Sequence, residues 1–174
     1  MAHVLIPLPS LDFDPTEVAI SWLVLTSEGH RVSFATPDGQ PAKADPVMVT
    51  GRGLDPWSPL PVLGHIKLIG LFLGANAQAR RAYAKMAATA TYQQPERWAN
   101  LKASEYDALL LAGGHRARGM RQFLESETLQ RLVVQFFDAQ KPVAAICHGV
   151  LLAARSKTSN GMSVLYGLNT TALT

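Results

Sequence analysis

The most constraining feature of this sequence is a short apolar run that ends in its single cysteine. Residues 143–146 (Val-Ala-Ala-Ile) are typical of a strand, Cys147 follows at once, and residues 150–154 continue as a helix. Ala145 and Gly149 are the small residues that a nucleophile elbow needs two positions before and after its nucleophile, because the backbone is tight there. Such a turn would hold the Cys147 sulfur at the C-terminal edge of a parallel sheet, where ligands bind in open α/β folds.

Cys147 and its neighbour His148 each have two interpretations that the local sequence leaves open. The start of a helix favours a thiolate, which predicts a reactive Cys147 with a pKa below about 8.5. The alternative is a buried structural cysteine after a strand. His148 is a candidate general base or substrate-facing group. Its alternative is a histidine bonded to backbone near the helix start.

The segments before this junction predict a parallel α/β sheet, in which strands alternate with helices. Asp14 is a suitable helix N-cap before Pro15, Glu17 occupies the capping-box position, and Gly29 ends this helix. A second amphipathic helix follows Ser126. Strands are predicted at residues 4–8, 31–36, 107–112 and 143–146, with a candidate strand at 163–166.

The middle of the chain is harder to assign. Residues 40–74 are rich in Pro and Gly, whereas residues 76–89 favour an exposed helix. A chain of 174 residues is long enough for one domain. We therefore interpret residues 1–174 as a single domain with an insertion or cap at about 40–103.

Composition excludes several classes of function. The net charge of +3 is spread thinly and forms no basic stripe, so we expect no nucleic-acid partner. One cysteine excludes an internal disulfide, a zinc knuckle and a Cys-x-x-Cys pair, and it suggests a reducing compartment. The N-terminus does not resemble a signal peptide, and the apolar stretch at 68–75 is too short to span a bilayer. We expect a soluble cytoplasmic protein with no membrane partner.

A glycine pair ends the strand predicted at 107–112. Gly113 and Gly114 would let backbone N–H groups face an anion or oxyanion, although a plain loop has the same pattern. Arg116, Arg118 and Arg121 follow and could attract anionic substrates. We favour the alternative that these arginines form a solvated loop and helix face.

Together these segments resemble the ThiJ/PfpI superfamily, the class I glutamine-amidotransferase-like proteins. The resemblance is carried by Val143-Ala-Ala-Ile-Cys-His-Gly149 and by Tyr106-Asp-Ala-Leu-Leu-Leu-Ala-Gly-Gly-His115. Asp14-Pro-Thr-Glu17 and Gly29-His-Arg-Val-Ser-Phe-Ala-Thr-Pro-Asp38 agree in order and spacing. The resemblance implies a flavodoxin-like three-layer α/β sandwich with a mostly parallel sheet. It also implies that the family's C-terminal part is absent from this chain.

The resemblance also implies a site and a function. Members of this family usually need no metal or cofactor and usually form homodimers. They are described as glyoxalases or deglycases, as amidases or peptidases, and as chaperones or oxidative-stress proteins. The implied site has Cys147 as nucleophile, Glu17 and His148 as catalytic partners, and Gly113, Gly114 and His115 as oxyanion or substrate-binding residues.

Two questions stay open at this point. Glu17 either caps its own helix or reaches the Cys147 sulfur, and a carboxyl with two oxygens can do both in part. A Cys-His-acid triad needs an acidic residue after His148, but Asp138 is the last acidic residue in the sequence.

From this sequence we expect a cysteine-dependent enzyme that acts on a small reactive carbonyl compound or on an amide or peptide bond. The alternative is a non-enzymatic redox sensor or chaperone-like stress protein that uses an oxidisable Cys147.

Overall fold

The computed structural model describes residues 1–61 and 68–171, and its centre is a parallel sheet. The sheet has five strands in the order β5 (Glu96–Arg97), β3 (Arg31–Thr36), β1 (His3–Pro7), β6 (Ala108–Leu111) and β7 (Val143–Ala145). Each pair of neighbours is parallel, so the C-terminal ends of all five strands meet at one edge. The predicted parallel α/β sheet is confirmed.

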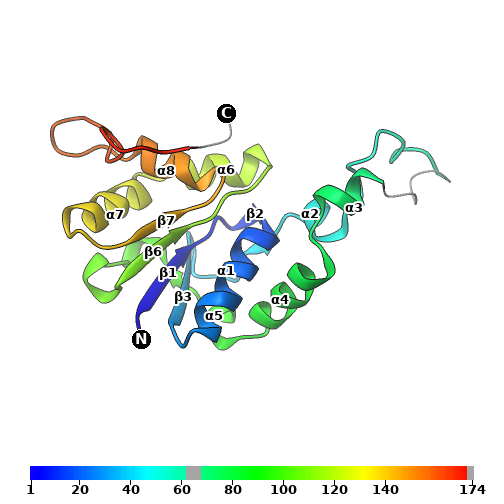
Figure 1. Ribbon diagram of the computed structural model, residues 1–174, viewed down its shortest axis with the longest axis horizontal. Helices are drawn as coiled ribbons and strands as arrows, with labels where there is room; N and C mark the ends of the chain where they lie inside the picture. The colour runs from blue at the N-terminus through cyan, green and yellow to red at the C-terminus, as the bar shows by residue number, and fades with distance from the viewer. Residues whose placement is uncertain (62–67, 172–174) are drawn as a thin grey trace.

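Helices cover both faces of this sheet (Figure 1). One face carries α1 (Pro15–Ser27), α4 (Ala77–Ala87) and α5 (Ala90–Gln93), and the other carries α6 (Ala117–Leu124), α7 (Glu127–Asp138) and α8 (Gly149–Arg155). Because both faces are covered, the central strand β1 buries apolar side chains on both sides: Leu5 faces one hydrophobic core and Ile6 the other. The flavodoxin-like three-layer arrangement is therefore confirmed.

Residues 40–103 divide between this body and an outer segment. The later part joins the body, since β5 adds a strand to the sheet and Trp98 donates from its indole nitrogen to Ala35 O at 3.1 Å. Two short 3₁₀ helices, Trp98–Asn100 and Ala103–Glu105, then lead into β6. Met86 on α4 is fully buried, so that helix is exposed on one side only.

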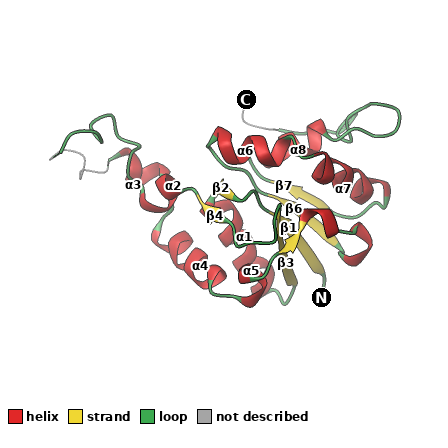
Figure 2. Cartoon of the chain, turned by 180° about the vertical axis from the view of Figure 1, so that it is seen from behind, coloured by secondary structure: helices red, strands yellow, loops and turns green. Residues whose placement is uncertain are grey.

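The earlier part of this region forms features that the sequence did not predict. β2 (Leu11–Phe13) pairs in parallel with β4 (Lys43–Ala44) beyond the end of β1. The chain then forms α2 (Pro46–Thr50) and α3 (Ile69–Leu73). Both helices lie at the end of the molecule, away from α7 (Figures 1 and 2). We refer to residues 46–61 and 68–75 as the arm.

The prediction of a strand at residues 163–166 was wrong. Ser163 makes an isolated antiparallel bridge to Lys157, and the backbone then turns, with Tyr166 N bonded to Ser163 O at 3.0 Å. Val164 is buried in the core beside α8 and Leu165 packs against it, rather than extending the sheet. These two apolar residues, which suggested a strand, are there because they pack in the core, and not because they pair with another strand.

Candidate active site

Cys147 lies in a strained turn between β7 and α8. Its φ is 51°, a left-handed conformation that a residue with a side chain rarely adopts. Gly149 is required two residues later, because a Cβ there would lie 2.1 Å from the carbonyl oxygen of Leu111 on the neighbouring strand. The junction therefore has the geometry of a nucleophile elbow at the C-terminal edge of the sheet.

His148 lies beside the sulfur. Its ring nitrogen Nδ1 is 3.4 Å from Cys147 Sγ, and its backbone N–H also donates to the sulfur. Among the described residues, the contacts recorded for the imidazole are with this sulfur and with the ring of His115, whose centroid is 6.1 Å away. No carboxylate bonded to His148 is found there, so a Cys-His-acid triad is not assembled from the described residues.

Glu17 does not close a capping box with its own helix. Asp14 caps α1 by itself, because its Oδ1 accepts from Thr16 N at 2.7 Å and from Glu17 N at 3.0 Å. The backbone N–H of Asp14 donates instead to Gly113 O at 3.0 Å. The Glu17 carboxyl is thereby free to cross to the end of β6, where its Oε2 accepts from Gly113 N at 2.6 Å.

This position brings the Glu17 carboxyl to the Cys147 thiol. The two groups are close enough for each to affect the pKa of the other. Burial raises the pKa of Glu17 above its ordinary value, the charge of Asp14 raises it further, and the Gly113 N–H opposes the shift. The raised pKa favours the protonated carboxyl, which can donate a hydrogen bond to sulfur.

The pKa of Cys147 moves in the direction opposite to the expected one. Burial raises it, and the negative charge of Glu17 raises it further. The His148 N–H lowers it without reversing the result. This direction is opposite to the thiolate expected at a helix start, because loss of solvent and a nearby carboxylate both favour the neutral thiol.

The glycine pair contributes differently from what was expected. The Gly113 N–H holds the Glu17 carboxyl, so this amide orients a catalytic candidate and is not available to an oxyanion. A Cβ on Gly114 would lie 2.5 Å from Asp12 O, so only glycine fits where the two backbones meet. The Gly114 N–H remains the candidate oxyanion donor.

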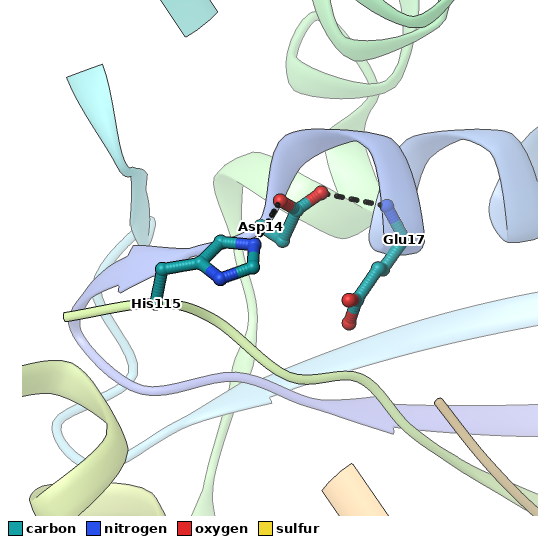
Figure 3. A group of neighbouring side chains, drawn as sticks. All are labelled: Asp14, Glu17 and His115. Carbon is teal, nitrogen blue, oxygen red and sulfur yellow. Dashed lines mark hydrogen bonds and ion pairs between the residues drawn. The ribbon is translucent and has the colours of Figure 1, made fainter. Parts of the chain in front are cut away.

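His115 faces the N-terminus of α1 across this edge (Figure 3). Its Nε2 lies 3.3 Å from Oδ2 of Asp14, whose other oxygen is occupied by helix capping. One possible metal-ligand atom from each of Asp14, Glu17 and His115 lies within 4.8 Å of the other two, and such a set of oxygen and nitrogen ligands could hold a divalent cation. Asp14 and Glu17 also bind the backbone amides of Thr16 and Gly113, respectively.

Two of the three arginines that we assigned to a solvated face pair with buried carboxylates. Arg118 Nε lies 2.9 Å from Oδ2 of Asp12, and Arg116 Nε lies 3.2 Å from Oδ1 of Asp45. Arg121 meets Glu125 on the exposed face of α6, as expected for a solvated arginine. Asp12 and Asp45 were not predicted from the sequence, although the Asp-Pro pattern at Asp45 repeats the helix start at Asp14.

The chain is also similar in sequence to known proteins. A sequence model described as ThiJ/PfpI family-like matches residues 61–174. An uncharacterised protein of Schizosaccharomyces pombe is 25% identical over 159 residues, which cover 87% of this chain and 53% of that protein. The chain thus spans about half the length of this relative.

Solved structures share the fold. A ThiJ/PfpI domain protein from Brachyspira murdochii superposes with a TM-score of 0.64 at 19% identity, over 99% of this chain and 70% of that one. Glyoxalase III from Candida albicans gives a TM-score of 0.58 at 15% identity, over 94% and 64% respectively. None of the helices in the described residues is long and apolar enough to cross a membrane. With an elbow cysteine at the end of a parallel strand and a matching family model, this chain belongs to the ThiJ/PfpI family.

Proposed function

We propose that this protein is a cysteine-dependent enzyme that acts on small reactive carbonyl compounds, in the manner of a glyoxalase. The observation that carries the proposal is the Glu17 carboxyl, which Gly113 N–H holds at 2.6 Å and which interacts with the Cys147 thiol. A carboxyl with a raised pKa that lies next to a nucleophile can exchange a proton with a carbonyl compound bound to that nucleophile. The name of the Candida albicans neighbour, glyoxalase III, is consistent with this chemistry.

In the first step, the Cys147 sulfur forms a bond to the aldehyde carbon. The thiol proton passes to His148 Nδ1, which lies 3.4 Å from the sulfur, and the aldehyde oxygen takes the proton of the Glu17 carboxyl. The product is a neutral hemithioacetal, and both charges remain on the protein as imidazolium and carboxylate. Gly114 N–H is the donor that we assign to the developing oxyanion.

For a substrate with a ketone next to the aldehyde, the Glu17 carboxylate then removes the hydrogen on the aldehyde carbon as a proton. His148 protonates the ketone oxygen, Glu17 returns its proton to the ketone carbon, and the hydroxyl proton on the former aldehyde carbon passes back to His148. The aldehyde carbon is thereby oxidised to a thioester while its neighbour is reduced to an alcohol, so no external oxidant is needed. Water cleaves the thioester and releases a 2-hydroxy acid and the free thiol.

Two features disfavour the other functions expected from the sequence. Amide hydrolysis needs an imidazole oriented by an acid, and no such acid is bonded to His148 among the described residues. Peroxide sensing needs an accessible thiolate, whereas burial and Glu17 raise the pKa of Cys147. Both functions are therefore outcomes of the test and not part of the proposal.

The test is incubation of the purified protein with methylglyoxal. We expect loss of the aldehyde, formation of lactate and no turnover by Cys147→Ser. A gain of two oxygen atoms on Cys147 in dilute peroxide, without turnover of methylglyoxal, would instead support the redox sensor. Turnover of a chromogenic amide without turnover of the aldehyde would support the hydrolase.

The single cysteine fits a reducing compartment, which favours the cytoplasm. Family membership favours a homodimer, which sedimentation at micromolar concentration tests. A single species near 18.8 kDa would contradict the dimer for this chain.

A further inference from the structure

We propose that a cavity between the arm and the turn at His115 binds the substituent of the carbonyl substrate, and that this substituent is neutral, apolar and about the size of an aromatic ring. The assignment to a substrate rests on the proposed function. The existence of a site for an apolar ligand does not, and the two are tested separately below.

The cavity has a volume of about 410 Å³, which lies in the range of small-molecule sites. The arm supplies an apolar wall from Val47 and Met48 on α2, Leu54 in the following turn and Leu73 on α3. Leu73 is 60% exposed, so a ligand here would cover apolar surface that now faces solvent. Removal of that surface from water is the source of affinity.

The opposite side of the cavity is polar but electrically balanced. It is formed by His115 and by Arg116, whose guanidinium Nε lies 3.2 Å from a carboxylate oxygen of buried Asp45. His115 likewise faces Asp14 at 3.3 Å. Since each basic group already has an acidic partner, the lining offers no uncompensated charge to a carboxylate or phosphate. A neutral substituent is therefore the better fit.

His115 joins the cavity to the elbow. Its ring forms part of the cavity lining and meets the His148 ring edge-on, with centroids 6.1 Å apart. His148 in turn is 3.4 Å from the Cys147 sulfur. The proposal places the substituent of a carbonyl carbon bonded to that sulfur past His115 and against the arm.

Binding is tested first without any reaction. The five methionines include Met48 in the cavity wall, Met86 on the buried side of α4 and Met162 on the surface. Methyl-labelled methionine therefore gives a local reporter with internal controls. Titration with acetophenone should shift the Met48 methyl resonance in a saturable way and leave Met162 unchanged. Acetone, which lacks the ring, should shift neither.

A matched pair of variants tests the location. Leu73→Gln places an amide in the cavity wall, whereas Phe72→Gln changes the adjacent residue of α3, which is 84% exposed and is not part of the cavity lining. Leu73→Gln should weaken acetophenone binding several-fold, and Phe72→Gln should leave it unchanged. Equal effects of both variants, or no Met48 shift in the wild-type protein, would overturn the site.

Turnover then tests the assignment to the substrate. Phenylglyoxal should have a kcat/KM at least about tenfold above that of methylglyoxal, and Leu73→Gln should reduce this ratio while Phe72→Gln preserves it. A Met48 shift without turnover of either aldehyde would support the apolar site and contradict the proposed reaction. Turnover with equal kcat/KM for both aldehydes would leave the reaction intact and contradict the substrate preference.

Discussion

The Glu17 carboxyl accepts a hydrogen bond of 2.6 Å from the backbone N–H of Gly113, which lies 96 positions later in the sequence. This bond joins the first turn of α1 to the residues that follow β6, at the edge where the parallel strands end. The same carboxyl interacts with the Cys147 thiol after β7. The Glu17 carboxyl thus connects three segments that are distant in the sequence, and the following predictions depend on that arrangement.

Cys147 should titrate above the ordinary range of a thiol. Burial and the negative charge of Glu17 both raise its pKa. The rate of iodoacetamide labelling, measured against pH, should therefore give an apparent pKa above about 8.5. Because the chain has one cysteine, Cys147→Ser should not be labelled at all. A midpoint below the ordinary value would contradict the electrostatic account.

Glu17→Gln should separate thiol acidity from catalysis. At pH values where Glu17 is ionised, the substitution removes a negative charge beside the sulfur, so the pKa of Cys147 should fall and labelling should become faster. Turnover of methylglyoxal should nevertheless be lost, because glutamine cannot exchange the proton. Glu28→Gln, at the exposed end of the same helix, is the matched control and should change neither quantity. Unchanged labelling in Glu17→Gln would argue against contact with the thiol.

The same substitution should change how stability depends on pH. The folded state raises the pKa of Glu17, so it favours the protonated form more than the unfolded state does. The contribution of Glu17 is therefore present at low pH and is lost as pH rises through the raised pKa. Glu17→Gln should gain stability relative to wild type as pH rises above about 4, as measured by urea unfolding. A difference that stays constant with pH would contradict the shift.

Asp14 should act as a helix cap whose charge is dispensable for folding. Asp14→Ala should lower the free energy of unfolding by about 1 kcal/mol, because Thr16 N and Glu17 N lose their acceptor. Asp14→Asn should stay within a few tenths of a kcal/mol of wild type, since asparagine caps equally well. Ser126→Ala removes the corresponding cap of α7 and gives the scale for comparison. A large loss in Asp14→Asn would instead assign stability to the ion pair with His115.

The elbow should store measurable backbone strain. Cys147 has a φ of 51°, which glycine adopts without the steric penalty of a Cβ. Cys147→Gly should therefore be more stable than Cys147→Ala by about 0.5–1 kcal/mol, even though glycine loses more entropy on folding. The comparison removes the thiol from both proteins, so it isolates the backbone. A more stable Cys147→Ala would show that the turn is unstrained.

The sequence by itself determined most of the sheet, because the signals involved are local. Apolar runs located β1, β3, β6 and β7, and the Asp14-Pro15 pair located the start of α1 through hydrogen bonds within three residues. The small residues around Cys147 predicted a tight turn for the same reason, since steric fit of the backbone depends on immediate neighbours. Where apolar residues served burial instead of pairing, as at Val164, the same signal predicted a strand wrongly.

Only the tertiary structure decided which groups the site residues contact and in which direction their pKa values shift. Glu17 could bond its own helix or a distant amide, and Gly113 became its partner because β1 and β6 are adjacent in the sheet. The direction of the Cys147 pKa shift depends on burial and on a carboxyl 130 positions away, neither of which a local pattern contains. Arg116 and Arg118 likewise pair with acids far from them in the sequence. Desolvation and charge act through space, so their effects on a residue depend on its neighbours in the folded structure. Strand and helix formation depend mainly on the residues that are close in the sequence.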